Sequence, residues 1–255
     1  MTENELLLSY IEDKIRQAED QYRITNTGFL SPQEKSQAAV CCRRNGARHV
    51  FYGGYPGAER TVLLLLPDYI ENPELFVPDE SDNPLCLLRC AAPQGVRALT
   101  HRDYLGSLLA LGIKRDVIGD ILVGKDGADI VILKSIAPFL AENYTKAGSV
   151  PLSCQIAAIG ELEAPEPHIE EIRESVASVR LDNMLDAAFG ISRAEAASAI
   201  SHGLVYINDI EAAKPDARLA PGDKLVLRGH GKAVFREILG TTRKGRLSVL
   251  IERYI

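Results

Sequence analysis

The side chains best suited to chemistry in this 255-residue sequence are cations in its last third. Arg193 directly follows Ser192, and Glu195 stands three residues after that serine, which is the spacing of a helix-capping box. The first turn of a helix presents free N–H groups and the positive end of the helix dipole, and together these bind phosphate. A guanidinium at this position adds a planar donor for the same anion. The pattern predicts a phosphate site at Ser192 and Arg193, with a local ion pair of Arg193 as the alternative.

A second cation, Arg180, opens another short predicted helix in the same region. Asp182 stands two residues later and is expected to cap that helix or to orient Arg180, in a structural rather than a catalytic role. Gly203 is expected to end the helix that starts at Ser192, and Asn208 to turn the chain between short strands. The elements that must position the cations are therefore two short helices followed by a small sheet.

Basic charge also concentrates between residues 224 and 246. Seven cations in that stretch face a single acid, Glu237: Lys224, Arg228, Lys232, Arg236, Arg243, Lys244 and Arg246. From Ser178 onward the sequence has 12 Lys and Arg against 9 Asp and Glu, a net charge of +3, whereas the preceding residues have a net charge of −9. Such asymmetry is typical of nucleic-acid binding. The other interpretation is a solvated basic face.

Length and hydropathy limit the remaining classes. The chain is long enough for two or three small domains. Its longest apolar run, Val62 to Pro67, is far shorter than the roughly 20 residues that a membrane span needs. The acidic, polar start is unlike a signal peptide. We therefore expect a cytoplasmic protein with no membrane partner.

The five cysteines do not indicate a disulfide framework, because their number is odd and two of them are adjacent. Cys86 and Cys90 lie four apart in a strand-like run and are expected to point to one face. No Cys-x-x-Cys pair occurs and the histidines are scattered. Buried thiols in a reducing compartment are therefore favoured over a metal site, and no cofactor is expected.

Residues 1–75 are predicted to form an α+β region. Apolar residues recur at helical spacing over residues 5–20, and Ser31-Pro32-Gln33-Glu34 is typical of a helix start. Two predicted strands and the loop between them follow at residues 49–52, 61–66 and 53–60. The loop is either a hairpin turn or a contact for RNA or protein. An acidic, proline-containing stretch at residues 68–84 marks a domain boundary.

Residues 82–160 alternate strands and helices in the order βαββαβ, which is the ferredoxin-like plait. The predicted elements occupy residues 85–91, 100–111, 117–123, 130–133, 136–144 and 150–156. RNA-recognition domains share this plait and stack bases on aromatic side chains of its central strands. The third strand, residues 128–133, has no aromatic residue, so we expect a scaffold or a ribosome contact. Lys114 and Arg115 are candidates for a secondary RNA contact, with plain surface charge as the alternative.

Residues 161–178 contain six glutamates and two prolines and are predicted to be an acidic linker. Its charges would repel RNA and keep the last domain, residues 179–255, extended from the plait. Mobility between these two domains follows from this interpretation.

Several short motifs with matching spacing recur in the last domain. They are Arg180-Leu181-Asp182, Ser192-Arg193, Gly203-Leu204-Val205 with Asn208, Lys214-Pro215, Gly222-Asp223 and Arg228-Gly229. Together they resemble the RNA-binding domain named after ribosomal protein S4. Asp209 departs from that pattern, because the family usually has Gly or another residue without a negative charge there, and this would weaken RNA contact. The candidate RNA contacts are Arg180, Ser192, Arg193, Lys214, Arg228, Lys232, Arg243, Lys244 and Arg246, supported by Asp182, Glu195, Gly203 and Asn208.

Motifs of the first two domains extend this resemblance over nearly the whole chain. They are Phe51-Tyr52-Gly53-Gly54-Tyr55, Ala58-Glu59-Arg60, the run from His101 to Leu109, Leu111 to Arg115, and Ile118 to Ile121. They are similar to the YlmH family of bacteria. The resemblance implies a monomeric RNA-binding protein of the large ribosomal subunit, with rRNA, tRNA and the ribosome as partners, in rescue of stalled subunits that hold peptidyl-tRNA. A cell-division label attached to that family is an alternative.

An RNA-modifying enzyme is the other alternative, because pseudouridine synthases carry the same RNA-binding module. Those enzymes place a catalytic Asp in a His-Arg-x-Asp setting, which His101-Arg102-Asp103 approaches. The intervening residue is absent here and no Thr-Ser-Gly follows, so Asp103 is interpreted as a helix-capping residue. We expect a non-enzymatic RNA-binding protein with an α+β fold: an N-terminal helical and hairpin region, a central ferredoxin-like, RRM-like βαββαβ plait and a C-terminal S4-type domain.

Overall fold

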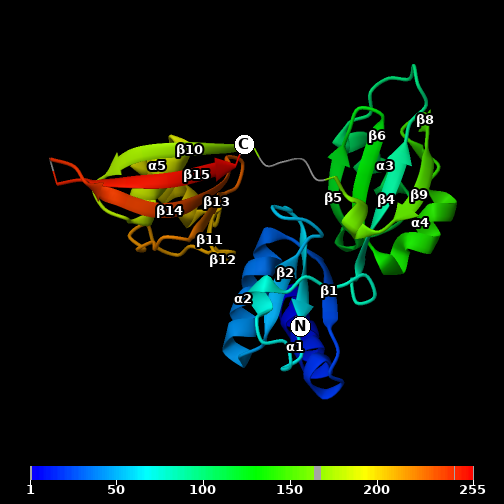
Figure 1. The fold of residues 1–255 in the computed structure, drawn as a ribbon, viewed down its shortest axis with the longest axis horizontal. Helices are drawn as coiled ribbons and strands as arrows, with labels where there is room; N and C mark the ends of the chain where they lie inside the picture. The colour runs from blue at the N-terminus through cyan, green and yellow to red at the C-terminus, as the bar shows by residue number, and fades with distance from the viewer. Residues whose placement is uncertain (1, 164–167, 244, 255) are drawn as a thin grey trace. The chain divides into compact units, whose positions relative to one another are not determined.

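The computed structural model describes residues 2–163, 168–243 and 245–254. The chain forms two compact units, one built mainly from residues 1–165 and the other mainly from residues 166–255. Figure 1 shows the elements of each unit. The two units are described separately below.

The first unit begins with a small antiparallel sheet and two helices. Its elements are α1 (Glu3–Asp20), β1 (Thr25–Leu30), α2 (Pro32–Asn45), β2 (His49–Tyr52), β3 (Thr61–Leu65) and the 3-10 turn η1 (Pro73–Leu75). The strand order is β1-β3-β2. The predicted helices and the β2–β3 pair are confirmed. The strand β1 was missed.

Both helices of this region begin where the capping pattern indicates. The Ser31 hydroxyl accepts a hydrogen bond from the backbone N–H of Glu34 over 3.3 Å, and the Ser31 N–H donates to the Glu34 carboxylate over 2.7 Å. Gly46 ends α2 in the left-handed conformation, with φ 63°. Local sequence alone therefore determines the extent of α2.

The plait follows with the strand order expected for a split βαββαβ unit. Its main elements are β4 (Leu85–Ala91), α3 (His101–Ala110), β5 (Ile118–Val123), β6 (Gly127–Leu133), α4 (Ala137–Asn143) and β9 (Ser153–Ala157). Short elements complete it: η2 (Arg115–Val117), η3 (Lys134–Ile136), β7 (Lys146–Ala147), β8 (Val150–Pro151) and η4 (Ile159–Glu161). The sheet order is β5-β6-β4-β9, with antiparallel pairing throughout.

The two faces of the plait sheet have different neighbours. On one face, Cys86, Leu88 and Cys90 of β4 pack with residues of α3 and α4, so the expectation that Cys86 and Cys90 share a face is confirmed. On the other face, Leu85 and Leu87 pack against the β1-β3-β2 sheet in a second apolar cluster. The first sheet therefore covers this part of the face.

The loop over residues 53–60 joins the two sheets of this unit. Tyr55 donates its hydroxyl to the Asp120 carboxylate over 2.8 Å, and the backbone N–H groups of Glu59 and Arg60 donate to the same carboxylate. The Arg60 guanidinium donates to the backbone carbonyls of Ile118, Phe29 and Arg115. The loop is therefore an intramolecular clasp, which goes beyond the hairpin turn expected from its sequence.

The second unit is a six-stranded sheet with two helices packed on one face. It comprises β10 (Ile169–Val176), α5 (Leu181–Phe189), α6 (Arg193–Ser201), β11 (Val205–Ile207), β12 (Ile210–Glu211), β13 (Lys224–Leu227), β14 (Gly231–Thr241) and β15 (Leu247–Tyr254). The strand order is β10-β15-β14-β13-β11-β12. Apolar residues of α5 and α6, among them Leu185 and Ile200, meet Phe235 of β14 and Ile251 of β15 in one core.

The prediction of an acidic linker over residues 161–178 is wrong for its second half, and residues 164–167 lie outside the described part of the chain. Residues Ile169–Val176 form β10, which pairs antiparallel with β15 from Ile169↔Tyr254 to Val176↔Leu247. Val176 is buried in the core of the unit, and Ile172 packs against it. The glutamates occupy exposed positions of an edge strand, where charged side chains are ordinary and discourage pairing with another chain. The prediction failed because the many glutamates of this stretch hide its few apolar residues, Ile172 and Val176, which pack into the core.

Candidate nucleic-acid interface

The start of α5 is held by the segment that precedes β13. The backbone N–H of Leu181 donates to the Ala217 carbonyl over 2.8 Å, and that of Asp182 donates to the Pro215 carbonyl over 3.0 Å. These N–H groups, which a free helix end would offer to a phosphate, therefore already have acceptors. At this end of the unit, an anion must be bound by side chains.

Asp182 orients Arg180, which is one of the two roles predicted for it; the other was to cap the helix. The guanidinium binds the Asp182 carboxylate with both oxygens, Nε to Oδ1 and Nη2 to Oδ2, each over 3.1 Å. The Arg180 side chain nevertheless remains 45% exposed. A β-bridge joins Arg180 to Arg218, so the 214–218 segment adds Lys214 and Arg218 to this region. Sequence reasoning missed Arg218, although it stands only four residues after Lys214.

The start of α6 carries the predicted capping box. The Ser192 hydroxyl accepts from the Glu195 N–H over 3.2 Å, and the Ser192 N–H donates to the Glu195 carboxylate over 2.7 Å. These hydrogen bonds to Ser192 lower the pKa of Glu195, and the nearby His230 adds a smaller effect in the same direction. An ionised carboxylate thus stands at the positive end of the helix dipole. Ser192 is therefore committed to fixing the helix start, and Arg193 is the group left to attract a phosphate there.

The turn between β13 and β14 carries Arg228 and lies beside the residues that follow α6. The Arg228 N–H donates to the Leu204 carbonyl over 2.9 Å, which ties this turn to the residues that follow α6. His230 of the same turn is close enough to influence the charge of Glu195. Arg193 begins α6, whereas Arg228 and His230 stand in the turn beside the residues that follow this helix. His230 was not among the predicted site residues, and its place after Arg228 and Gly229 was the signal available.

Four cations of the basic stretch between residues 224 and 246 are bound to other groups of the second unit, and two of them, Lys232 and Arg246, were predicted RNA contacts. The Lys224 ammonium lies 2.7 Å from the Asp209 carboxylate, and the Arg236 guanidinium lies 2.6 Å from that of Glu252. Lys232 stacks over the Tyr254 ring at 3.9 Å, and Arg246 donates to the Ser175 carbonyl. The apparent excess of cations over acids between residues 224 and 246 is thus partly balanced by neighbouring strands.

Other cations of this unit carry charge that no protein group balances. Within residues 168–243 and 245–254, these side chains have no hydrogen-bond or ion-pair partner, and all are exposed: Arg193, Lys214, Arg218, Arg228 and Arg243. Lys244, also a predicted contact, lies outside the described residues. A cation without a carboxylate partner loses no protein contact when it binds a phosphate.

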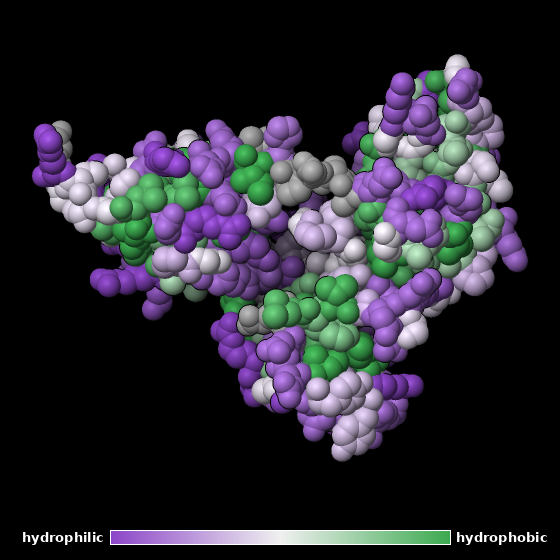
Figure 2. All heavy atoms as spheres, viewed as in Figure 1, coloured by the Kyte–Doolittle hydropathy of each residue, from purple (hydrophilic) through white to green (hydrophobic). Residues whose placement is uncertain are grey.

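Arg243 stands near the tip of a long hairpin. The strand β14 has only exposed residues from Arg236 to Thr241, whereas its first half reaches the core through Ala233 and Phe235. Two irregularities interrupt its pairing with β15, after Phe235 and after Ile238. Figure 2 shows hydrophilic side chains gathered at the end of this hairpin. Because β10 pairs with β15 as far as Leu247, this end of the sheet is three-stranded, and Arg243 lies just beyond the last paired residues of β14 and β15.

The turn at Asn208 and Asp209 has the geometry of a two-residue hairpin. Both residues have positive φ, 48° and 67°, which is the type I′ conformation that favours Asn and Gly. The Asn208 side chain donates to Asp223 over 2.7 Å and accepts from the Lys224 N–H over 2.9 Å. Asn208 therefore supports the structure, as expected. The unusual Asp209 directs its charge at Lys224.

The candidate secondary contact at Lys114 and Arg115 divides into two different environments. Lys114 is exposed. Arg115 is partly buried, and its guanidinium donates to the carbonyls of Ile118 and Gly119 over 2.5 and 3.2 Å. Burial and the neighbouring charge of Arg60 lower the pKa of Arg115 to about 10. Arg115 thus stabilises the clasp described above, and Lys114 is the member of the pair that can meet RNA.

Asp103 has the geometry of a capping residue. Its carboxylate accepts from the Thr100 N–H and hydroxyl, each over 2.8 Å, and Arg97 binds it over 2.7 Å. These hydrogen bonds, from Arg97 first, hold the pKa of Asp103 well below its usual value. The interpretation of His101-Arg102-Asp103 as a helix start is confirmed.

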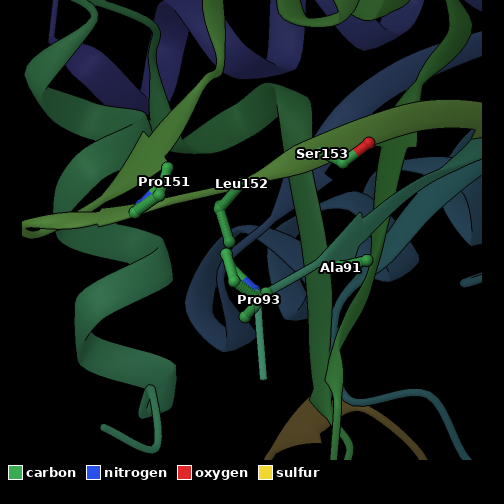
Figure 3. Close-up of a pocket in the computed structure, with 6 residues that line it drawn as sticks. Ala91, Pro93, Pro151, Leu152 and Ser153 are labelled. Atoms are coloured by element: carbon green, nitrogen blue, oxygen red, sulfur yellow. The ribbon is translucent and has the colours of Figure 1, made fainter. Parts of the chain in front are cut away.

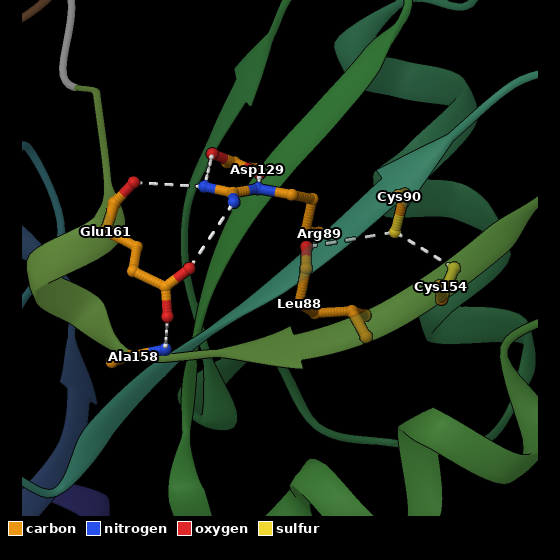
Figure 4. A network of polar contacts seen from close by, with 7 residues as sticks. All are labelled: Leu88, Arg89, Cys90, Asp129, Cys154, Ala158 and Glu161. Atoms are coloured by element: carbon orange, nitrogen blue, oxygen red, sulfur yellow. Dashed lines mark hydrogen bonds and ion pairs between the residues drawn. The ribbon is translucent and has the colours of Figure 1, made fainter.

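The part of the plait face that the first sheet leaves uncovered carries an ion-pair network rather than stacking groups. Arg89 binds the Asp129 carboxylate through Nε over 2.9 Å and Nη2 over 3.0 Å, and also reaches Glu161 (Figure 4). The acids thus hold the one cation of this network. They make this area a poor binding site for a polyanion.

Two further features bear on the class of protein. Within the described ranges 2–163, 168–243 and 245–254, no three His, Cys, Asp or Glu side chains meet in a way that could hold a metal ion. None of the helices in the described part of the chain has both the length and the apolar character needed to cross a membrane.

Comparison with known proteins agrees with this geometry. Residues 78–161 match the family model described as "Putative RNA-binding domain in YlmH", and residues 179–225 match the S4 domain. The "Ribosome-associated protein quality control protein P2" of Bacillus subtilis (strain 168) is 30% identical over 238 residues, which is 93% of this chain and 90% of that protein. A solved structure, "Cell division protein ylmH from Streptococcus pneumoniae", has 27% identity and a TM-score of 0.49, and covers 63% of this chain and 94% of that one.

The chain is an RNA-binding protein whose second unit contains an S4 domain. The matches extend over both units. The chain belongs to the YlmH family of RNA-binding proteins.

Proposed function

We propose that this chain is a non-enzymatic factor that binds rRNA of the large ribosomal subunit, and tRNA held there, in quality control of stalled subunits. It acts as a monomer in the cytoplasm. The name of the B. subtilis relative supports the ribosomal setting. The observation that carries the proposal is the group of unbalanced cations around α6, above all Arg193 and Arg228.

Binding through phosphates follows from the kind of groups that are available. Arg193 and Arg228 are exposed, one at the start of α6 and the other in the turn between β13 and β14. Double-stranded RNA hides its base edges in a deep, narrow major groove, so proteins recognise it mainly by shape and by backbone contacts. Two guanidiniums on neighbouring elements suit two phosphates of such a backbone. Arg243 on the hairpin tip adds a contact at a second position.

The plait is assigned a positioning role. Half of the sheet face that RNA-recognition domains use for bases packs against the first sheet through Leu85, Leu87 and Val131. The other half holds the Arg89–Asp129 pair. Without stacking side chains or free cations on that face, the plait contributes to where the factor binds more than to how tightly.

The absence of catalysis is part of the proposal. Asp103, the residue that most resembles a catalytic acid, has its carboxylate occupied by Arg97 and Thr100. A group held in this way stays ionised and has no free position for a substrate. Uridines of RNA incubated with the protein are therefore expected to remain unmodified.

Substitution of Arg193 tests the interface. We expect Arg193→Ala to weaken cosedimentation with large ribosomal subunits. It should lower RNA affinity in general and leave sequence preference unchanged. The slope of log affinity against log salt should flatten by roughly one, because one phosphate contact is lost. Arg236→Ala is the matched control: it also removes one Arg charge from the unit, but this Arg is neutralised by Glu252. Equal slopes for Arg193→Ala and the unchanged protein would remove Arg193 from the interface.

A further inference from the structure

Two cysteine thiols of the plait lie in direct contact. Cys90 of β4 and Cys154 of β9 are directly opposite each other in the antiparallel pair. Their sulfur atoms are 3.1 Å apart and share a hydrogen bond (Figure 4). Residues opposite each other in antiparallel strands have Cα atoms about 4.5–5.5 Å apart, within the range that a disulfide spans. The two strands therefore already hold these thiols in a position from which they can be joined.

The two thiols differ in their access to solvent. Cys90 is only 2% exposed and belongs to the core between the sheet and the helices. Cys154 is partly exposed, because β9 is the edge strand of the sheet. A cavity of about 380 Å³ lies one residue further along both strands, where Ala91 and Ser153 line it together with Pro93, Pro151 and Leu152 (Figure 3). Because Cys154 is itself partly exposed, a small oxidant can reach it from solvent, whereas Cys90 is buried.

We propose that Cys90 and Cys154 form a peroxide-sensitive thiol pair that oxidises to a disulfide within the plait. Cys154 is the attacking thiol, and Cys90 is the resolving thiol. The proposal does not depend on RNA binding.

The chemistry needs only a hydroperoxide as the oxidant. The Cys154 thiolate attacks one oxygen of hydrogen peroxide, the O–O bond breaks, and hydroxide leaves, so that Cys154 becomes a sulfenic acid. The Cys90 sulfur then attacks the Cys154 sulfur, its proton passes to the departing oxygen, and water is released as the disulfide forms. Two thiols and one peroxide thus give one disulfide and two waters. The hydrogen bond to Cys90 lowers the pKa of Cys154, which favours the thiolate required for the first step.

The remaining cysteines of the chain are internal comparisons. Cys86 stands on the same strand and the same face as Cys90 and is also buried. Burial raises its pKa to about 11, which opposes thiolate formation. Cys41 and Cys42 are adjacent in α2 and buried. Among the described residues, none of these three forms a hydrogen bond to another cysteine sulfur, as Cys90 and Cys154 do.

The test uses the full chain, reduced, freed of reductant and treated with a small molar excess of hydrogen peroxide. Remaining thiols are alkylated, and the tryptic peptides are measured by mass spectrometry. Cleavage after Arg89 separates Cys90 from Cys86, and cleavage after Lys146 and Arg173 isolates Cys154. We expect the peptides of residues 90–97 and 147–173 to be joined, with the loss of two hydrogens.

The disulfide should also stabilise the plait reversibly. It would close a loop between positions 64 residues apart, and restricting the unfolded chain in this way should raise the melting temperature by roughly 5 °C or more. Dithiothreitol should reverse the shift. Cys154→Ser should abolish both the joined peptides and the shift, and Cys86→Ser should leave both intact. If Cys90 and Cys154 both remain open to alkylation after peroxide treatment, or if Cys154 joins another cysteine instead, the proposal is wrong.

Discussion

At the scale of single residues, the value of a cation for RNA binding depends on which protein group already holds its charge. Lys224 and Arg236 lie in the most basic stretch of the sequence, yet Asp209 and Glu252 neutralise them. Arg193 and Arg228 are exposed with no such partner among the described residues. Sequence reasoning could identify all of these cations but could not rank them. The partners of Lys224 and Arg236 stand 15 and 16 residues away in the chain, on a turn and on a neighbouring strand.

Capping is the residue-scale feature that the sequence predicts best. Ser31, Thr100 and Ser192 all make the expected capping boxes, because the partner stands only three residues away. Asn208 was recognised as a turn residue for the same reason. The clasp from Tyr55 and Arg60 to Asp120 was not predicted, since it joins positions about 60 residues apart in the chain.

A pH prediction follows from Asp103. Its folded-state pKa is depressed, mainly by Arg97, so its contribution to stability is present above the ordinary carboxyl pKa of about 4 and is lost as pH falls further. We expect Asp103→Asn to be less stable than the unchanged protein at pH 7. The difference should shrink between about pH 4 and pH 2, because there the Asp103 carboxylate becomes protonated in the unfolded chain while the folded protein still keeps it ionised.

Chemical denaturation of both proteins across this pH range measures the difference. A gap that stays constant down to pH 2 would show that Asp103 is not held by charged hydrogen bonds. Asp126→Asn is a suitable control, because Asp126 is exposed on the turn between β5 and β6.

At the scale of elements, the largest difference between expectation and structure is β10. Its glutamates favour a linker, but pairing with all of β15 and burial of Val176 outweigh that composition. The strand β1 was missed for a related reason, because its Asn26 and Gly28 are poor strand formers. In both cases tertiary pairing decides the conformation, and no local pattern records it. The elements of the plait, whose hydrophobic periodicity is regular, were predicted well.

Substitution within β10 distinguishes a strand from a linker. Val176→Asp should lower the unfolding free energy of the second unit by roughly 3 kcal/mol or more, because it places an unpaired carboxylate in the core. A linker residue would tolerate the same change. Urea unfolding followed by circular dichroism measures the effect, with the exposed Glu171→Asp as the control. Identical unfolding curves for the Val176 variant and the unchanged protein would contradict the assignment of β10 to the core.

At the scale of the whole molecule, β10 also changes how the charge is distributed. Residues 166–255 contain 13 Lys and Arg and 13 Asp and Glu, so this part of the chain has no net charge, and residues 1–165 have a net charge of −6. The positive excess found from Ser178 onward is therefore a local property of one part of the unit. Association with RNA must depend on local positive potential rather than on net charge, and it should fall steeply with salt.

The central claim is that the S4-containing unit supplies the RNA contacts and that the plait face does not. Ultraviolet crosslinking of the full chain to purified large ribosomal subunits, followed by mass spectrometry of the RNA-linked peptides, tests it most directly. We predict crosslinks within residues 192–194, 228–230 and 241–246. Crosslinks concentrated on the strands β4 and β6 of the plait, with none in the second unit, would contradict it.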